Sequence, residues 1–263
     1  MSGTWERNRS MALWRLDRIL THMGVCSRRE VKAFLRAGRV CVGGQKSLSP
    51  EDKFDPEEAE IRVDGQRIFF SEHVYLILNK PVGILSAKES ETEKAAIDLL
   101  PEPIRKREVY PAGRLDKDAS GLLLMTDDGD FCHQVISPKK RVYKRYEVRC
   151  EGCPSPEDAA LFEKGILLED GTTCLPGKLE ILQPGPESRC AVVICEGKFH
   201  QVKRMMAAVG KPVISLRRTD IGSVHLDEDL QPGEYRVLRE SEAKMALQNG
   251  DYALQWVKNH ENI

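Results

Sequence analysis

The sequence predicts an α+β protein with two structured parts: a small basic module of helices and strands, followed by a larger domain of mixed helices and strands. Three observations support this. The first 50 residues hold two helix-period segments and ten lysines or arginines against three acidic residues. From residue 74 onward, short apolar runs alternate with turns that contain glycine and proline, as in a sheet. A length of 263 residues is sufficient for one large domain or two.

The first predicted helix follows a polar stretch. Residues 1–12 are polar and basic and have no apolar period, so we expect a disordered leader. Apolar residues then recur at helical spacing over residues 16–23, and Gly24 is expected to end that helix. Ordered structure is therefore expected from residue 13.

A second short helix and two strands complete the first module. Residues 27–30 (Ser-Arg-Arg-Glu) have the pattern of a capping box, in which the serine is the N-cap and the glutamate bonds back to it. The helix is expected to stop at Gly38, and strands are expected at residues 40–42 and 61–63. The module is therefore placed at residues 13–63.

The second helix carries a dense set of cations. Arg28, Arg29, Lys32 and Arg36 lie on or beside it. Such side chains bind phosphates and fix position without reading sequence, although an exposed basic face without an RNA partner is the plainer alternative. The strings "RLDRILTHMGVCSRREV" and "GRVCVGG" resemble the RNA-binding domain named after ribosomal protein S4, with Gly43 where that family usually has asparagine. The resemblance implies that the four side chains bind RNA.

The second domain is expected to begin after a linker. We interpret residues 64–74 as that linker, residues 75–241 as the domain, and residues 242–263 as a helical or partly ordered tail. The first strand of the domain ends in "NKPVG", whose proline and glycine require a fixed turn. Lys80 in this string is predicted either to orient the turn or to contact RNA. Residues 154–195 alternate strand-like runs with turns and are interpreted as scaffold.

A charged loop leading into a buried strand forms the centre of the second domain. Residues 112–121 are polar and contain glycine, and residues 122–126 are an apolar run that ends at a turn. Asp116 lies between Arg114 and Lys117, and nearby cations favour an ionised carboxylate that can act as a nucleophile. An isolated aspartate of this kind is more often a solvated loop residue, so the wider motif decides its role.

The wider motif is specific. "GRLD" followed by "SGLLLMTDDG" closely resembles the catalytic motif of RNA pseudouridine synthases, in the form found in the small-ribosomal-subunit pseudouridine synthase A family. Ala119 stands where that family more often has threonine. The resemblance covers residues 14–241. It implies a mainly antiparallel sheet, an active site in a cleft across that sheet, and Asp116 as the catalytic aspartate.

Two further strings extend the resemblance. "KRYEV" is similar to the family's second motif, which implies that Tyr146 stacks on a flipped base; a plain core tyrosine on a strand is the alternative. "EGKFHQVKRM" resembles the third motif. It implies that a base from this string pairs with Asp116, with Lys203 as the first choice and Arg204 as the second. Arg204 is also expected to bind RNA. Arg114 is implied to fill the gap left by the flipped base or to bind phosphate.

The implied reaction converts a specific uridine of ribosomal RNA, with small-subunit RNA preferred, to pseudouridine. It requires no cofactor, metal or energy source. A uracil inside a duplex cannot be reached, so base flipping is required. The sequence leaves open whether Asp116 attacks the anomeric carbon of the ribose or abstracts a ribose proton. The expected partner is ribosomal RNA or a pre-ribosomal subunit, and we expect a monomer.

Three alternatives remain. Large-subunit enzymes of the same superfamily share the architecture. A non-catalytic ribosomal RNA-binding assembly factor would not need Asp116. A zinc protein would use the two closely spaced cysteine pairs Cys150, Cys153, Cys190 and Cys195. The eight cysteines are scattered, however, and free thiols are expected. His200 is a conceivable general base or metal ligand, but no second histidine lies at ligand spacing, so we expect no metal site.

Charge and hydropathy narrow the class further. The net charge of −1 conceals a second basic block, residues 197–218, with six lysines or arginines and no acidic residue. Two such blocks favour a face that binds a polyanion such as nucleic acid. No apolar run reaches membrane-spanning length, and the N-terminus lacks the apolar core of a signal peptide. We therefore expect no membrane partner and a cytoplasmic protein.

Overall fold

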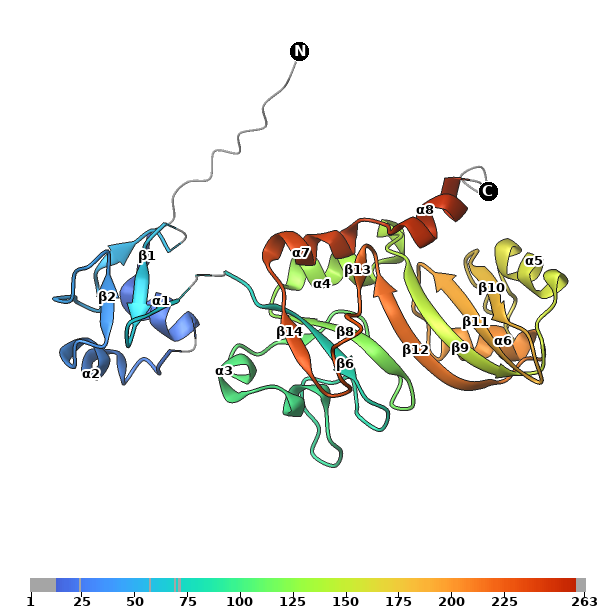
Figure 1. Cartoon of the computed structure of the whole chain (residues 1–263), viewed down its shortest axis with the longest axis horizontal. Coiled ribbons are helices and arrows are strands. Elements are labelled where there is room, and N and C mark those ends of the chain that lie inside the picture. Colours follow the sequence, from blue (N-terminus) through green and yellow to red (C-terminus); the bar gives the residue numbers. More distant parts are fainter. Residues whose placement is uncertain (1–12, 24, 57, 69, 71, 259–263) are drawn as a thin grey trace, which may run out of the picture. The chain divides into compact units, whose positions relative to one another are not determined.

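The computed structural model describes residues 13–258, apart from residues 24, 57, 69 and 71. The predicted leader, residues 1–12, lies outside the described part. The contacts divide the chain into two units (Figure 1). Unit 1 extends to residue 72 and includes the segment Glu102–Arg107; unit 2 contains the rest of the chain. None of the helices within the described residues is long and apolar enough to span a bilayer.

Unit 1 is a small α+β module. Its elements are β1 (Trp14–Arg15), α1 (Leu16–His22), α2 (Val31–Arg36), β2 (Val40–Val42), β3 (Lys53–Phe54), β4 (Ile61–Val63) and β5 (Gln66–Ile68). Strand β1 pairs with β3, and β2, β4 and β5 form an antiparallel sheet. Leu16, Ile19 and Leu20 of α1 are fully buried against this sheet and α2, which confirms the helical period seen in the sequence.

Strand β5 corrects the predicted linker. Residues 66–68, expected to lie within the linker, pair with β4 across a turn at Asp64 and Gly65. Both turn residues have positive φ, 51° and 83°, and an Asp-Gly pair adopts this left-handed geometry readily in a tight hairpin. The hairpin therefore continues unit 1 beyond residue 63.

The start of α2 differs in detail from the predicted capping box. The Glu30 carboxylate accepts hydrogen bonds from the Ser27 backbone amide at 2.8 Å and from the Ser27 hydroxyl at 2.6 Å. The hydroxyl therefore donates to Glu30 and does not cap a backbone amide, and regular helix begins only at Val31. The pair closes the turn that precedes the helix.

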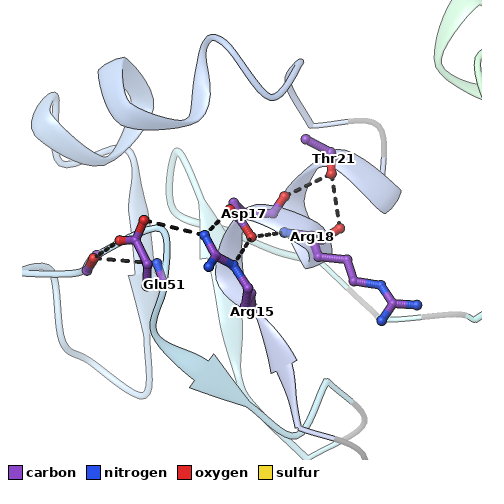
Figure 2. Close-up of polar contacts among 6 residues, drawn as sticks. Arg15, Asp17, Arg18, Thr21 and Glu51 are labelled. Carbon is purple, nitrogen blue, oxygen red and sulfur yellow. Dashed lines mark hydrogen bonds and ion pairs between the residues drawn. The ribbon is translucent and has the colours of Figure 1, made fainter.

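Figure 2 shows how Arg15 is fixed at the start of α1. Its guanidinium donates to Asp17 at 2.7 Å and reaches Glu51 at 3.4 Å. The hydrogen bond from Arg15 holds the pKa of Asp17 below its usual value. Thr21 donates to the backbone carbonyls of Asp17 and Arg18 in the same helix. Arg15 is therefore engaged within unit 1, unlike the cations of α2.

Unit 2 is built on a nine-stranded sheet in the order β10-β11-β9-β12-β8-β6-β14, with β13 beside β12 and β7 beside β8 (Figure 1). All its strand pairs are antiparallel except β12 with β8. This confirms the mainly antiparallel sheet implied by the resemblance. The strands are β6 (Tyr75–Lys80), β7 (Tyr110–Pro111), β8 (Ser120–Thr126), β9 (Lys144–Glu151), β10 (Lys178–Gln183), β11 (Glu187–Ile194), β12 (Val213–Ile221), β13 (Val224–His225) and β14 (Tyr235–Val237).

Helices cover the sheet and join its strands. They are α4 (Gly129–Ile136), α5 (Pro156–Lys164), α6 (Gln201–Ala208), α7 (Glu240–Lys244) and α8 (Asp251–Lys258), with 3-10 turns at Ala96–Leu99, Pro138–Lys140 and Met245–Leu247; α3 (Glu102–Arg105) belongs to unit 1. Asp128 caps α4 by accepting from the Phe131 amide at 2.9 Å. Phe131 then packs with Leu122 and Leu124 of β8 in the main core.

Two predictions for unit 2 were wrong. The stretch 154–195, expected to alternate strands and turns, contains the helix α5, whose N-cap Ser155 accepts from the amide of Asp158. The C-terminal segment is helical, as expected, but it is not a separate tail: Ala243 and Ala246 are buried in the main core. Trp256 of α8 is buried too and packs edge-on against Tyr143, with ring centroids 5.9 Å apart. The apolar residues of the C-terminal segment therefore complete the fold.

Candidate active site

The loop of residues 113–119, between β7 and β8, is held by Arg218 of β12. The Arg218 guanidinium is almost entirely buried and donates to the carbonyl of Gly113 at 2.8 Å. It also donates to the carbonyls of Arg114 at 3.4 Å and Leu122 at 2.8 Å. One side chain thus ties three backbone groups around the loop to the central strand β12.

The other side of the loop is fixed by the segment that follows β6. The Ser86 hydroxyl donates to the Leu115 carbonyl at 2.7 Å and accepts from the Leu115 amide at 3.0 Å. The Gly83 amide donates to the Lys117 carbonyl at 2.7 Å. The residues on both sides of Asp116 are therefore bonded to the scaffold, which is the support that a precisely positioned catalytic side chain requires.

Strand β8 leaves the loop through a glycine that no other residue can replace without movement. Gly121 has φ of +100°, and a Cβ at this position would lie 2.2 Å from the Arg218 carbonyl oxygen. Its parallel partner β12 pairs at this point, with Arg218 opposite Gly121. The close approach of the two backbones brings the loop next to the buried guanidinium.

Asp116 faces a lysine and a histidine. Lys203 of α6 places Nζ 3.0 Å from Asp116 Oδ2, and it also contacts the carboxylate of Asp118. His200 Nε2 lies 3.7 Å from Asp116 Oδ1. Burial opposes the charge on Lys203, but the two carboxylates outweigh it and raise the pKa of Lys203. The hydrogen bond from Lys203 lowers the pKa of Asp118.

Two adjoining cavities, of about 70 Å³ and 370 Å³, surround this carboxylate. Both are lined by Arg114, Asp116, Tyr146 and His200. Tyr146 is buried on β9, on the strand face shared by alternate residues. Asp116 keeps a quarter of its side chain exposed. The arrangement presents an ionisable carboxylate and an aromatic ring to one open cleft.

The structure brings together most of the residues expected at the site. Asp116, Tyr146 and Lys203 converge, and Arg114 is exposed at the rim of the cavities. Arg204, the second choice as partner of Asp116, instead forms an ion pair with Asp170 at 2.5 Å. Arg28, Arg29, Lys32 and Arg36 are exposed in unit 1.

The position of Lys80 rules out one of its two predicted roles, the contact with RNA. Its side chain is fully buried, and the ammonium donates to the carbonyls of Pro81 at 2.9 Å and Ile84 at 2.8 Å, with Lys117 at 3.4 Å. Burial lowers the pKa of Lys80 to about 8. A side chain in this environment cannot contact RNA phosphate. The alternative prediction, that Lys80 orients the turn, agrees with these bonds.

Sequence reasoning missed three residues that shape the site. Arg218 was considered only as part of the basic block of residues 197–218, and the sequence around Ser86 gave no indication of a role. His200 was considered in isolation, without its proximity to Asp116. It adopts a left-handed backbone conformation with φ of 49°, which a residue other than glycine rarely adopts and which often marks a functional position. The position of His200 in a basic string, shortly before the predicted motif lysine, was the only sequence feature that could have indicated its place at the site.

The zinc alternative finds no support. Within the described part of the chain, no three His, Cys, Asp or Glu side chains form a group that could hold a metal ion. All eight cysteines are free thiols, and Cys150 and Cys190 are buried while Cys153 is exposed. Burial raises the pKa of both buried thiols, which disfavours the thiolate that binds metal.

Comparison with known proteins extends these observations. The model of the RNA pseudouridylate synthase family matches residues 74–208, and that of the S4 domain matches residues 14–61. An uncharacterized RNA pseudouridine synthase of Bacillus subtilis (strain 168) is 43% identical, covering 87% of this chain and 96% of its own length. The ribosomal small subunit pseudouridine synthase A of Yersinia pestis is 40% identical over 87% of this chain and 96% of its own length.

A solved structure agrees with the sequence matches. A crystal structure of a pseudouridylate synthase superimposes with a TM-score of 0.62 at 34% identity, covering 88% of this chain and 99% of that chain. The similarity therefore includes both units described above and extends through the loop of residues 113–119.

Proposed function

The chain belongs to the RNA pseudouridylate synthase family, and we propose that it converts one uridine of small-subunit ribosomal RNA to pseudouridine, with Asp116 as the catalytic carboxylate. The observation that supports this most directly is the pairing of Asp116 with Lys203 at a cavity that also contains Tyr146. The names of the relatives from Yersinia pestis and Escherichia coli, both ribosomal small subunit pseudouridine synthase A, favour this RNA as the substrate.

Asp116 acts at the ribose of the target nucleotide. Its carboxylate either attacks C1′ or removes a ribose proton, and in both routes the C1′–N1 bond breaks with its electron pair moving to the base. The base turns, a C1′–C5 bond forms, C5 loses its proton and N1 gains one. Because substrate and product are isomers, the reaction balances without a cofactor. Lys203, 3.0 Å from Asp116 Oδ2, orients the carboxylate.

The base enters the cavity from a flipped nucleotide. Tyr146 offers an aromatic face within the cavity on which the uracil stacks. Arg114, exposed at the rim, is placed to contact the phosphate beside the flipped nucleotide or to fill the vacated position in the helix. Flipping removes the base from its stack, so these interactions must compensate for the stacking energy that is given up.

Unit 1 supplies affinity for the RNA backbone. Arg28, Arg29, Lys32 and Arg36 are exposed around α2, and exposed cations bind phosphates in a salt-dependent way. The bound RNA would be ribosomal RNA, free or in an assembling subunit, which places the protein in the cytoplasm. The division of labour is affinity from unit 1 and chemistry from unit 2.

Pseudouridine mapping across ribosomal RNA tests the proposal. Cells with and without the gene are compared, and the deletion is complemented with the wild-type gene or with Asp116→Asn. Loss of one small-subunit site, restored by the wild-type gene and not by the variant, is expected. Loss of a large-subunit site would move the substrate to the large subunit and keep the chemistry. If no ribosomal site changes, the proposed substrate is wrong and a non-catalytic binding role becomes the better explanation.

A further inference from the structure

Unit 2 contains two buried lysines whose surroundings differ. The ammonium of Lys80 is surrounded by backbone carbonyls that accept its hydrogen bonds. Lys144, the first residue of β9, is 5% exposed, and no described residue accepts a hydrogen bond from its ammonium. Its nitrogen is not one of the fully enclosed unpaired atoms among the described residues, so it reaches the space of the cavity that it lines. Removing most of a cation from water is costly, so the position of this lysine calls for an explanation.

Lys144 lies in the catalytic cavity. It lines the 370 Å³ space together with Asp116, Tyr146 and Arg218. Lys144 and Tyr146 are two residues apart on β9, and both are buried on the same face of the strand. The lysine therefore flanks the aromatic ring on which the flipped base is proposed to stack.

No carboxylate of the described residues neutralises this cation. Two acidic residues line the cavity, and both have other partners. Asp116 pairs with Lys203, and the oxygens of Glu196 accept from the Leu175 amide, from Gln201 and from Lys198. Cys195 is close, but burial raises the pKa of its thiol and keeps it neutral. Arg218 adds a second positive charge. The cavity is thus electropositive, and its lysine has hydrogens to donate.

The occupant of the cavity can supply the missing acceptor. Uracil carries two carbonyl oxygens, and when the C1′–N1 bond breaks the departing base holds a negative charge shared among N1, O2 and O4. A cation fixed in a site shielded from water stabilises developing charge far better than water-exposed cations do. Burial, with a smaller effect of Arg218, lowers the pKa of Lys144 to about 8, so the ammonium form predominates near neutral pH.

We propose that Lys144 is a uracil-binding catalytic residue, whose ammonium donates a hydrogen bond to a carbonyl oxygen of the flipped base and stabilises the charge on that base when its bond to the ribose breaks. The inference rests on the proposed function. It adds a contact to the base itself, whereas Asp116 and Lys203 act at the ribose. The proposal also explains why an uncompensated lysine is retained beside Tyr146.

Thio-substituted RNA tests the contact. Sulfur is a weaker hydrogen-bond acceptor than oxygen, so target uridines with sulfur at C2 or C4 are compared with normal uridine in a short RNA under single-turnover conditions. For the wild type, one of the two substitutions should slow pseudouridine formation about tenfold. For Lys144→Met, the normal substrate should react about 100-fold more slowly with RNA affinity within about twofold, and the sulfur effect should disappear.

The controls separate a contact from a structural role. Lys144→Arg keeps a cationic donor, so it should form pseudouridine at least about tenfold faster than Lys144→Met. Lys80→Met also removes a buried lysine but should retain the wild-type sulfur effect, because its ammonium contacts only backbone carbonyls.

Each outcome supports or overturns the proposed role of Lys144. An unchanged sulfur effect in folded Lys144→Met overturns the proposal. If that variant does not fold, the wild type alone is sufficient, since equal rates for both thio substrates and uridine would exclude the contact. A wild type that forms no pseudouridine in any ribosomal RNA would instead overturn the proposed function. An active wild type with no sulfur effect would remove only the role of Lys144.

Discussion

The two units use positive charge in opposite ways. Around α2 of unit 1, Arg28, Arg29 and Lys32 are exposed to solvent. In unit 2, Lys80 is fully buried, while Lys203 is wedged between two carboxylates. Exposed cations cost the folded state little free energy and attract any polyanion. Salt screens them, however, and their side chains have no fixed geometry. Buried cations lower the stability of the folded state, but their charged groups are held in a fixed position and orientation.

We expect this difference to separate RNA affinity and chemistry between two parts of the molecule. Removing an exposed cation leaves nothing unsatisfied behind it, so the folded state tolerates the loss. Removing a buried one leaves carbonyls or carboxylates without a partner. Substitutions in unit 2 should therefore damage turnover or stability, and substitutions in unit 1 should damage binding. Variants at Asp116, Lys203, Lys80 and the cations of α2 test this division.

Asp116→Asn should reduce turnover by at least about 10⁴-fold, because an amide can neither attack C1′ nor accept a ribose proton. RNA affinity should stay within about twofold, since binding is distributed over many cations. Pseudouridine formation by mass spectrometry and RNA affinity by filter binding provide the two measurements. A loss of affinity as large as the loss of activity would contradict the separation of the two functions.

Lys203→Met should lower kcat about 10²- to 10³-fold, because Asp116 and Asp118 lose the cation they share. Arg204→Met is the matched control on the next residue of α6, where the guanidinium pairs with Asp170. We expect that control to keep kcat within about threefold. Equal losses in single-turnover kcat for the two variants would show that the position in α6 matters more than the ion pair.

Lys80→Met should destabilise the protein by about 2–3 kcal/mol, because carbonyls that accept from the ammonium are left unsatisfied. The folded-state pKa of about 8 lies below the ordinary value of 10.5, so the unfolded chain binds more protons between these values. Wild-type stability then gains from Lys80 as pH rises from 8 to 10.5, and the variant lacks that gain.

Urea denaturation at pH 7.5 and 9.5 measures both effects. The destabilisation caused by Lys80→Met should be larger at the higher pH. A difference that shrinks as the pH is raised would show that Lys80 is not held with a lowered pKa, and its burial would then need another explanation.

Replacing Arg28, Arg29, Lys32 and Arg36 together by alanine should weaken RNA binding about 10- to 50-fold and leave kcat at saturating RNA within about twofold. The slope of log affinity against log salt should fall by about 0.7 to 0.9 for each phosphate that the variant no longer neutralises. Arg15→Met is the control, since Arg15 is held by Asp17 and Glu51. If the salt slope stays unchanged in the fourfold variant, α2 is not the RNA-binding face.

Local features of the fold could be read from the sequence. The helical period expected over residues 16–23 corresponds to α1 (Leu16–His22). Tyr146, for which a core position on a strand was the alternative, lies on the buried face of β9. Helix α5 was missed, although its Ser155 and Asp158 form a capping box at the start, because the proline and glycine residues around it indicated turns. The C-terminal segment was read as a tail because its few apolar residues find partners only in distant strands.

Local motifs were sufficient for the class of chemistry, since a long motif around Asp116 and two shorter strings identify the family. Some helices and tight turns could also be predicted, because caps and left-handed turns depend on neighbouring residues. Which cations are exposed and which are buried depends on the packing of the whole domain. Lys203 meets Asp118 across 85 positions, and Arg218 reaches the Gly113 carbonyl across 105. Burial and partner choice are set by segments far apart in the chain, so no local pattern could distinguish Lys80 and Lys144 from the lysines that face solvent.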